Sequence, residues 1–173
     1  MNTVSTIRRP VALQRQRGAA AVEFGLLCLI FLTIVLGILE LGRMLYLYNT
    51  MQEVSRRGAR EAVIRWVDQG TAIKTEALFG GSSVPAGAEI TASNIYIRYL
   101  NAAGNEVATL PSSPGDNMSA CSDITRTDQC IYSVSVSLEN VTYVPMVKLF
   151  TFLNIALPMA KVTMHAESLG FND

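Results

Sequence analysis

The stretch AAAVEFGLLCLIFLTIVLGIL, residues 19–39, decides the fold of this chain because it is long, apolar and almost uncharged. Glu23 is its only charged residue. At roughly 1.5 Å of rise per residue, a helix of this length spans about 30 Å, the thickness of the hydrocarbon core of a bilayer. We therefore predict a transmembrane helix over residues 19–42.

The charges before this stretch are all positive. The chain has 14 basic and 14 acidic residues in total, and residues 1–18 hold four of the basic ones and no acid: Arg8, Arg9, Arg15 and Arg17. Because positive segments stay in the cytoplasm, we expect an inside N-terminus and a C-terminal domain across the membrane. A basic leader before a net acidic body also argues against nucleic acid as a partner.

A cleaved secretory signal explains this segment poorly. The apolar core of such a signal is usually about 7–15 residues long and is followed by an A-x-A site, which is missing here. The pair Arg8–Arg9 is a weak match to a twin-arginine signal, because Pro10 follows it and the apolar run is too strong.

The helix is expected to continue outside the membrane, over residues 43–70. Apolar or small residues recur there at helical spacing, and Gly70 is a suitable stop. We predict one helix from about residue 19 to 67, with Gly58 as a weak point. The residues of the recurring stripe are Met51, Val54, Gly58, Ala62 and Trp66.

Residues 71–173 have the pattern of a small α+β domain. Alternation of apolar and polar residues predicts strands, and glycine, proline and asparagine mark the turns. The fold class is thus a long N-terminal helix packed on a small antiparallel sheet. The expected elements are a short helix at 72–79, a loop at 80–87, a hairpin of strands 95–100 and 106–110, a polar loop at 111–129, and strands at 133–138 and 160–167.

The apolar segment YVPMVKLFTFLNIALP, residues 143–158, is not expected to cross the membrane. Lys148, Asn154 and two prolines interrupt it, and too few residues separate Lys148 from Lys161 for a span. We expect a loop and a short helix that cover the sheet, or a surface that binds a partner.

The three cysteines fall in two settings. Cys28 lies within the apolar run, where a small buried or lipid-facing residue is the expected role. Cys121 and Cys130 lie in a polar, loop-like stretch, and an oxidising compartment would allow them to form a disulfide. Their spacing is not C-x-x-C, so it indicates neither zinc nor a redox centre. The sequence alone leaves their pairing open.

Two further features bear on packing at the membrane. Ala21-x-x-x-Gly25 and Thr33-x-x-x-Gly37 fit the small-residue spacing of helix interfaces in bilayers, although small residues are common in membrane spans. Glu40 and Arg43 either pair at i, i+3 or mark the outer membrane surface, and we favour the second interpretation.

The sequence offers no catalytic machinery. His165 is the only histidine, and it is expected on the solvated face of the last strand beside Lys161 and Glu167. We find no Ser/His/Asp set, no metal-binding cluster and no phosphate-binding loop. We therefore expect no enzyme activity, no metal or other cofactor and no small-molecule substrate.

The residues RGAAAVEF, 17–24, resemble a type IV prepilin processing site: a basic leader, a glycine, small residues, a glutamate and an aromatic. Residues 17–63 are similar to the TadE-like family, which are minor pilins or pseudopilins of the tight-adherence (Tad/Flp) pilus. Residues 40–43, Glu-Leu-Gly-Arg, match the family's E-hydrophobic-G-R pattern. The likeness returns weakly at YVP and AKVTMHAES near the end of the chain.

This resemblance implies a precursor in the bacterial inner membrane with its C-terminal domain in the periplasm, later in the pilus outside the cell. A prepilin peptidase would cut between Gly18 and Ala19, removing a cytoplasmic leader of residues 1–18. Glu23 and Phe24 would then be the fifth and sixth mature residues. The implied fold is type IV pilin-like, the implied partners are other pilins and the Tad assembly platform, and the implied role is adherence and biofilm formation.

Glu23 has two interpretations. In the first, its carboxylate neutralises the α-amine that cleavage leaves on Ala19, since buried charges are tolerated when paired. In the second, it is an interfacial acid favoured by the dipole at the start of a helix. A competing function is an uncleaved single-pass anchor with a periplasmic scaffold or binding domain. A membrane-tethered enzyme has no support from any residue.

Overall fold

The computed structural model describes residues 13–171, with side chains from residue 18 onward. Most of the predicted leader therefore lies outside the described residues. The fold is α+β, as predicted, and the chain divides into two compact units, of which one ends at Leu41 and the other begins at Gly42. The long helix α1, Leu13–Ile64, runs through this boundary.

The predicted bounds of the long helix are wrong at both ends. It begins at Leu13, before the expected start at residue 19, because Leu, Gln and Arg all favour helix and Pro10 is the nearest residue that opposes it. It also ends before residue 67, at Ile64. Gly58 is not a weak point, because α1 passes through it without a break.

Gly70 does not stop α1, contrary to expectation. The backbone turns extended at Trp66, and Gly70 then opens the short helix α2, Gly70–Ala77, after a single 3-10 turn, η1, Val67–Gln69. The last carbonyls of α1 are capped from the far end of the chain. The N–H of Leu169 donates to Val63 O at 3.1 Å, and that of Gly170 donates to Ile64 O at 2.8 Å.

The main sheet has three antiparallel strands in the order β3-β4-β7: β3, Ile95–Leu100; β4, Ser133–Leu138; and β7, Ala160–His165. These strands were expected, but the hairpin between 95–100 and 106–110 is wrong. The returning segment makes one bridge, Glu106 to Leu100, and one further bond from Val107 N–H to Tyr99 O. It then runs towards Pro111, which has no N–H for a ladder.

The remaining elements include several that the sequence did not reveal. The expected loop at 80–87 contains strand β1 and the start of β2, and the expected polar loop at 111–129 contains helix α3. They are β1, Ser83–Val84; β2, Gly87–Thr91; η2, Ala92–Asn94; α3, Pro114–Ser122; β5, Thr142–Tyr143; η3, Lys148–Leu153; and β6, Ile155–Ala156. β1 pairs with β2, and β5 pairs with β6, both antiparallel.

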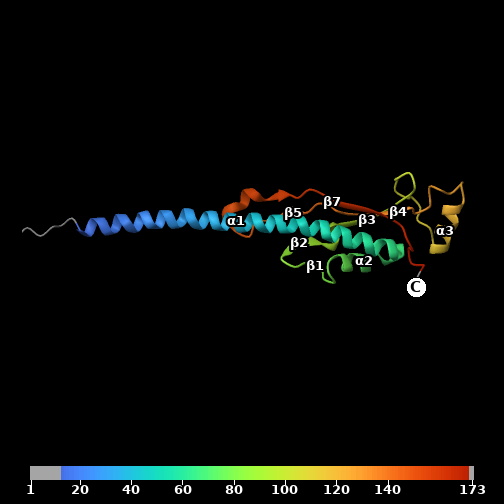
Figure 1. Cartoon of the computed structure of the whole chain (residues 1–173), viewed down its shortest axis with the longest axis horizontal. Helices are drawn as coiled ribbons and strands as arrows, with labels where there is room; N and C mark the ends of the chain where they lie inside the picture. Colours follow the sequence, from blue (N-terminus) through green and yellow to red (C-terminus); the bar gives the residue numbers. More distant parts are fainter. Residues whose placement is uncertain (1–12, 172–173) are drawn as a thin grey trace, which may run out of the picture. The chain divides into compact units, whose positions relative to one another are not determined.

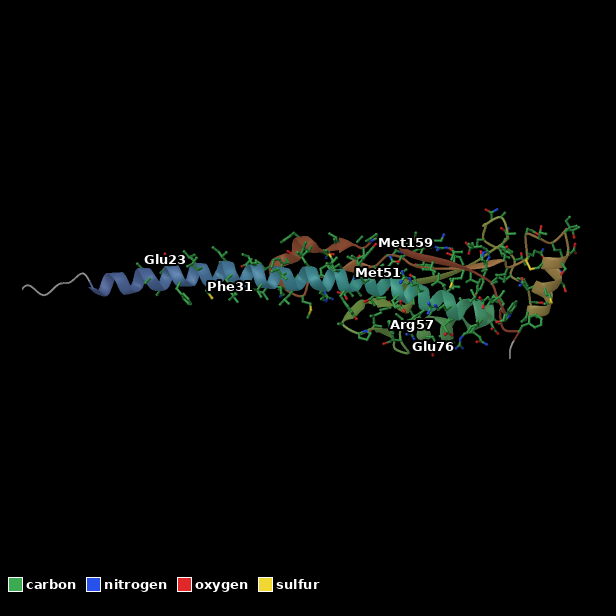
Figure 2. The ribbon with its side chains drawn as sticks, viewed as in Figure 1. Glu23, Phe31, Met51, Arg57, Glu76 and Met159 are labelled. Carbon is green, nitrogen blue, oxygen red and sulfur yellow. A yellow bond between two sulfur atoms is a disulfide. The ribbon has the colours of Figure 1, made fainter. Side chains whose placement is uncertain are left out.

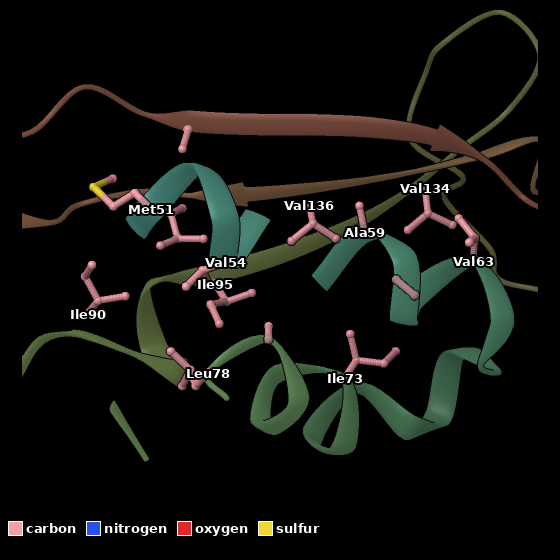
Figure 3. Packing of buried hydrophobic residues seen from close by; sticks show 14 of the residues in the cluster. Met51, Val54, Ala59, Val63, Ile73, Leu78, Ile90, Ile95, Val134 and Val136 are labelled. Carbon is pink, nitrogen blue, oxygen red and sulfur yellow. The ribbon is translucent and has the colours of Figure 1, made fainter. Parts of the chain in front are cut away.

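The core of the second unit forms around the C-terminal half of α1 (Figure 1). This half lies between the three-stranded sheet on one side and α2 with the β1–β2 hairpin on the other. Figure 3 shows Met51, Val54 and Ala59 of α1 packed among residues of both layers. The predicted stripe on α1 is confirmed, since Met51, Val54 and Ala62 are fully buried.

The central strand β4 is buried on both faces, so its alternation of valine and serine does not separate a dry face from a wet one. Val134, Val136 and Leu138 face α1, and their neighbours on β3 and β7 in register are also apolar. On the opposite face Ser137 donates to Glu139 Oε1 and accepts from Arg98, at 2.7 Å each. Small side chains on the middle strand allow the longer ones of the edge strands to cover it.

Candidate assembly and membrane-anchoring segments

Over residues 19–39, α1 is apolar around its circumference apart from Glu23, and none of these residues is buried. Val22, Phe24 and Phe31 are each more than 60% exposed, and Figure 2 shows Phe31 on this part of the helix. The most apolar 18-residue window has a mean hydropathy of 2.7, and none of it is buried. A helix that is hydrophobic all round requires an apolar environment. This one is long and apolar enough to anchor the chain in a membrane.

The four residues of the predicted processing site, Gly18, Ala19, Glu23 and Phe24, all lie on this exposed part of α1. Ala19 and Glu23 are four residues apart and therefore share one face of the helix, one turn from each other. Gly18 has open space where a Cβ would point. The carboxylate of Glu23 is thus available on the surface of the helix, one turn from the proposed new N-terminus.

The predicted helix-packing residues, Ala21, Gly25, Thr33 and Gly37, lie on the same helix. Ala21 and Gly25 are exposed, and a Cβ at Gly25 would meet nothing within 4 Å. The Thr33 hydroxyl donates to the Leu29 carbonyl at 2.8 Å. Because this bond satisfies the hydroxyl within its own helix, Thr33 can face lipid or a second helix without an unpaired donor. Gly37 follows one turn later, and Cys28 is a free thiol on this segment.

Near the start of the second unit, Arg43 holds three segments together. Arg43 forms a salt bridge with Glu89 of β2, and its Nη1 donates to Val144 O at 2.8 Å. Its guanidinium carbon also lies 5.1 Å from the centre of the Tyr143 ring. Arg43 therefore has a structural role, and the membrane-surface role predicted for it stays a prediction. Glu89 was not singled out from the sequence, because no local spacing links it to Arg43.

The region around α3 is closed by a disulfide between Cys121 and Cys130, the pair that the sequence left open. Next to it, the Asn117 side chain accepts the Ile131 N–H at 2.8 Å, and Arg126 pairs with Asp116 at 3.0 Å. The backbone N–H of Ser112 and the Arg126 guanidinium lower the pKa of Asp116. The disulfide thus joins a short helix, a loop and the start of β4.

His165 is exposed at the end of β7, and its ring meets the Tyr132 ring edge-on at 5.1 Å. It borders a cavity of about 340 Å³ between α3 and the C-terminal segment, lined also by Met118 and Phe171. Within residues 18–171, no three His, Cys, Asp or Glu side chains are placed to hold a metal ion.

The family model described as "TadE-like protein" matches residues 18–60 of this chain. The match covers about a quarter of the chain and confirms the resemblance seen in the sequence. It begins at Gly18 and ends within the part of α1 that packs on the sheet. No curated protein and no solved structure is detectably similar to the chain.

Proposed function

We propose that this chain is the precursor of a minor pilin or pseudopilin of a Tad-type pilus, matured by a prepilin peptidase that cuts between Gly18 and Ala19. It acts as a structural protein and not as an enzyme. Its apolar helix anchors it in the inner membrane, with the second unit in the periplasm. From there it joins an adhesive pilus that supports biofilm formation.

One observation carries this proposal. The TadE-like match begins at Gly18, the residue before the proposed cut, and Glu23 follows at the position that the processing motif requires. No residue of α1 from there to Leu39 is buried, so this part of the helix can pack against the equivalent helices of other pilins. The small residues Ala21 and Gly25 would allow such helices to approach closely.

In the proposed mechanism, Glu23 compensates the charge of the new N-terminus. The α-amine of a chain that begins at Ala19 has an ordinary pKa of about 7.7–8.0 and is largely protonated at neutral pH. Within an apolar bundle this cation needs a partner, and Glu23 of the same chain or of a neighbour supplies one. A pairing between the Ala19 amine of one subunit and Glu23 of its neighbour would fix how far the two subunits are shifted along the pilus axis.

A specific feature of α1 supports the alternative of an uncleaved anchor. The helix begins at Leu13, so the Gly18–Ala19 bond lies inside it, and a helical bond must open before a protease can cut it. Glycine is the residue that makes such opening easiest short of proline, because it costs about 1 kcal/mol in a helix interior. Gly18 thus reconciles a continuous helix with cleavage.

The N-terminal sequence and intact mass of the protein from native membranes or sheared pili test the cleavage. We expect a chain that begins at Ala19, and we expect Gly18→Leu to abolish processing by filling the space beside the scissile bond. Gly25→Leu is the matched control, because Gly25 is also helical and open. Retention of residues 1–18 in cells with an active prepilin peptidase would establish the uncleaved anchor instead.

Glu23→Ala tests the assembly mechanism separately. We expect the variant to stay in the membrane and to be processed, but not to enter pili, whereas Phe24→Leu should preserve assembly. Normal piliation of Glu23→Ala would show that the carboxylate is only an interfacial acid.

A further inference from the structure

The second unit carries a group of uncovered apolar side chains on and around η3, which we call the η3 patch. The patch follows β5, runs through η3 and continues past β6. Its members and their exposed fractions are Val144 50%, Met146 76%, Leu149 59%, Phe152 73%, Ile155 42% and Met159 56%. Large apolar side chains that are this exposed and this close in sequence are typical of a surface that contacts a membrane or another protein.

η3 is built to present these residues outward. Phe150 is the one buried residue of the helix, with 8% exposure, and it meets the Phe152 ring edge-on at 6.1 Å. Leu149 and Phe152, next to it in the sequence, are 59% and 73% exposed. Part of the segment covers the core as expected, because Tyr143 is buried in it and Leu153 and Leu157 pack against it. The expectation of a binding surface stays a prediction.

The patch is tied to the end of the second unit that is attached to the apolar helix. Arg43, the second residue of this unit, donates to the carbonyl of Val144, the first residue of the patch, and stacks on Tyr143. Arg43 follows Leu39 by four residues, which is about 6 Å along a helix. The residue that holds Val144 is thus close in sequence to the apolar run of residues 19–39.

The charge of this segment fits a lipid surface. No acidic residue occurs from Val141 to Ala166, and Lys148 and Lys161 are both exposed. Phenylalanine and leucine next to lysine are the composition of segments that lie in the headgroup layer, where apolar side chains enter the acyl boundary and cations meet anionic lipids.

We propose that the η3 patch is a second membrane contact: Leu149 and Phe152 insert into the acyl boundary of the non-cytoplasmic leaflet, and Lys148 meets anionic headgroups. The contact rests on the proposed anchoring by α1. It holds the second unit against the bilayer before assembly, and it must be released when the subunit leaves the membrane.

Tryptophan fluorescence of the full chain in vesicles tests this contact. In a Trp66→Phe background, single tryptophans replace Phe152, Ile124 or Leu32. The vesicles are of phosphatidylcholine and phosphatidylglycerol, with and without bromine on the acyl chains. We expect Phe152→Trp to lose roughly half of its emission to brominated chains, as befits insertion by about 5–10 Å. Met146→Trp provides a second position in the patch.

The two other tryptophans separate the possible results. Ile124 is 89% exposed and equally apolar, but it lies in the disulfide loop and should not be quenched. Leu32→Trp reports on the span. Quenching at Leu32→Trp but at neither patch position would overturn the membrane contact and leave the anchor intact, and a protein partner would then cover the patch. Absence of quenching at Leu32→Trp would overturn the anchor and the contact together.

Discussion

Gly58 on α1 lies so close to Val136 on β4 that a Cβ built on the glycine would be 3.1 Å from Val136 Cγ1 and 3.4 Å from the Cβ of Ala77 on α2. The helix, the sheet and α2 therefore meet at a single position without a side chain. A glycine inside a helix normally costs stability. Here that cost is offset by the close approach of three elements, all of which are buried at this point.

Replacing Gly58 by leucine should destabilise the second unit by about 2–3 kcal/mol, since its side chain has no room between β4 and α2. Gly58→Ala should be nearly neutral, because the gain in helix propensity of up to about 1 kcal/mol compensates the tight contact with Val136. Chemical unfolding in detergent, followed by near-ultraviolet circular dichroism, measures both.

Gly42→Leu is the matched control, because Gly42 is also on α1 but a Cβ there would meet nothing within 4 Å. Equal loss of stability at positions 42 and 58 would show that the contact with Val136 is not what limits residue 58.

The parts of the fold that could be predicted have regular periodicity in the sequence. The apolar residues of α1, β3, β4 and β7 that face the core recur with the period of the helix or strand that carries them, even in β4, where the serines of the other face are buried too. The helix α3 has no such stripe and was missed, because its residues have the composition of a polar loop; its start signal is purely local. Ser113 caps it by accepting the Asp116 N–H at 3.1 Å, with Pro114 as its first residue.

Features that depend on distant residues could not be read from the sequence. The strand that pairs with β3 is β4, which lies more than 30 residues further on, and the local turn at residues 101–105 wrongly favoured the nearer segment. In the same way, Arg43 pairs with Glu89 across elements that no spacing rule connects. The proposed processing residues could be named from the sequence because such a motif depends only on the order of residues along the chain.

Tyr99→Phe should stabilise the second unit by about 1 kcal/mol. The Tyr99 side chain is 7% exposed, and its hydroxyl has no hydrogen-bond partner among the described residues. Removing a buried, unpaired polar group recovers its desolvation cost. Tyr96→Phe on the same strand is the control and should change little, since Tyr96 is on the opposite, exposed face. A loss of stability in Tyr99→Phe would mean that the hydroxyl is satisfied.

We also expect Tyr99 to make stability depend on pH in the alkaline range. Burial, together with the charge of Asp68, raises the pKa of Tyr99 to about 12. Since ionisation is harder in the folded than in the unfolded state, stability should fall as the pH rises above 10, the ordinary pKa of tyrosine. The free energy of unfolding, measured from pH 8 to 11, should decline more in the parent protein than in Tyr99→Phe. Equal slopes would contradict this prediction.

We expect the ion pair of Glu139 with Arg98 to make stability depend on pH in the acid range. Hydrogen bonds from Arg98 and Ser137 lower the pKa of this carboxyl. The ionised carboxylate therefore contributes fully to stability above its pKa in the unfolded chain, about 4.3. This contribution is lost as the pH falls through the lower pKa that the carboxyl has in the folded protein. Because the pair is partly exposed, we expect it to be worth less than about 1 kcal/mol. Glu139→Gln should flatten the decline of stability below pH 5, whereas Glu53→Gln on the exposed side of α1 should not.

Breaking the disulfide should destabilise the α3 region. The loop between Cys121 and Cys130 is short, and closing such a loop is worth about 2–3 kcal/mol in the chain-entropy model. The double variant Cys121→Ala/Cys130→Ala should lower the midpoint of unfolding, and a reductant should lower that of the parent by the same amount. Cys28→Ala controls for the loss of a thiol. Insensitivity of the parent to reductant would show that the bond contributes nothing.

The C-terminal end of α1 is capped by residues remote in sequence, because the amides of Leu169 and Gly170 donate to its last carbonyls. Gly170 has a φ of +80°, and a Cβ on it would lie 2.9 Å from the Cβ of Trp66. Gly170→Ala should therefore displace the segment that donates to Val63 O and Ile64 O. In this variant we expect faster hydrogen exchange at the amides of residues 169 and 170, measured by nuclear magnetic resonance or mass spectrometry. Gly104→Ala is the control, since its φ is +81° but its surroundings are open. The free energy of unfolding of both variants is measured as well. An equal loss in the two variants would mean that only the backbone conformation matters. A loss larger by at least about 1 kcal/mol in Gly170→Ala would show that the close contact with Trp66 limits this position.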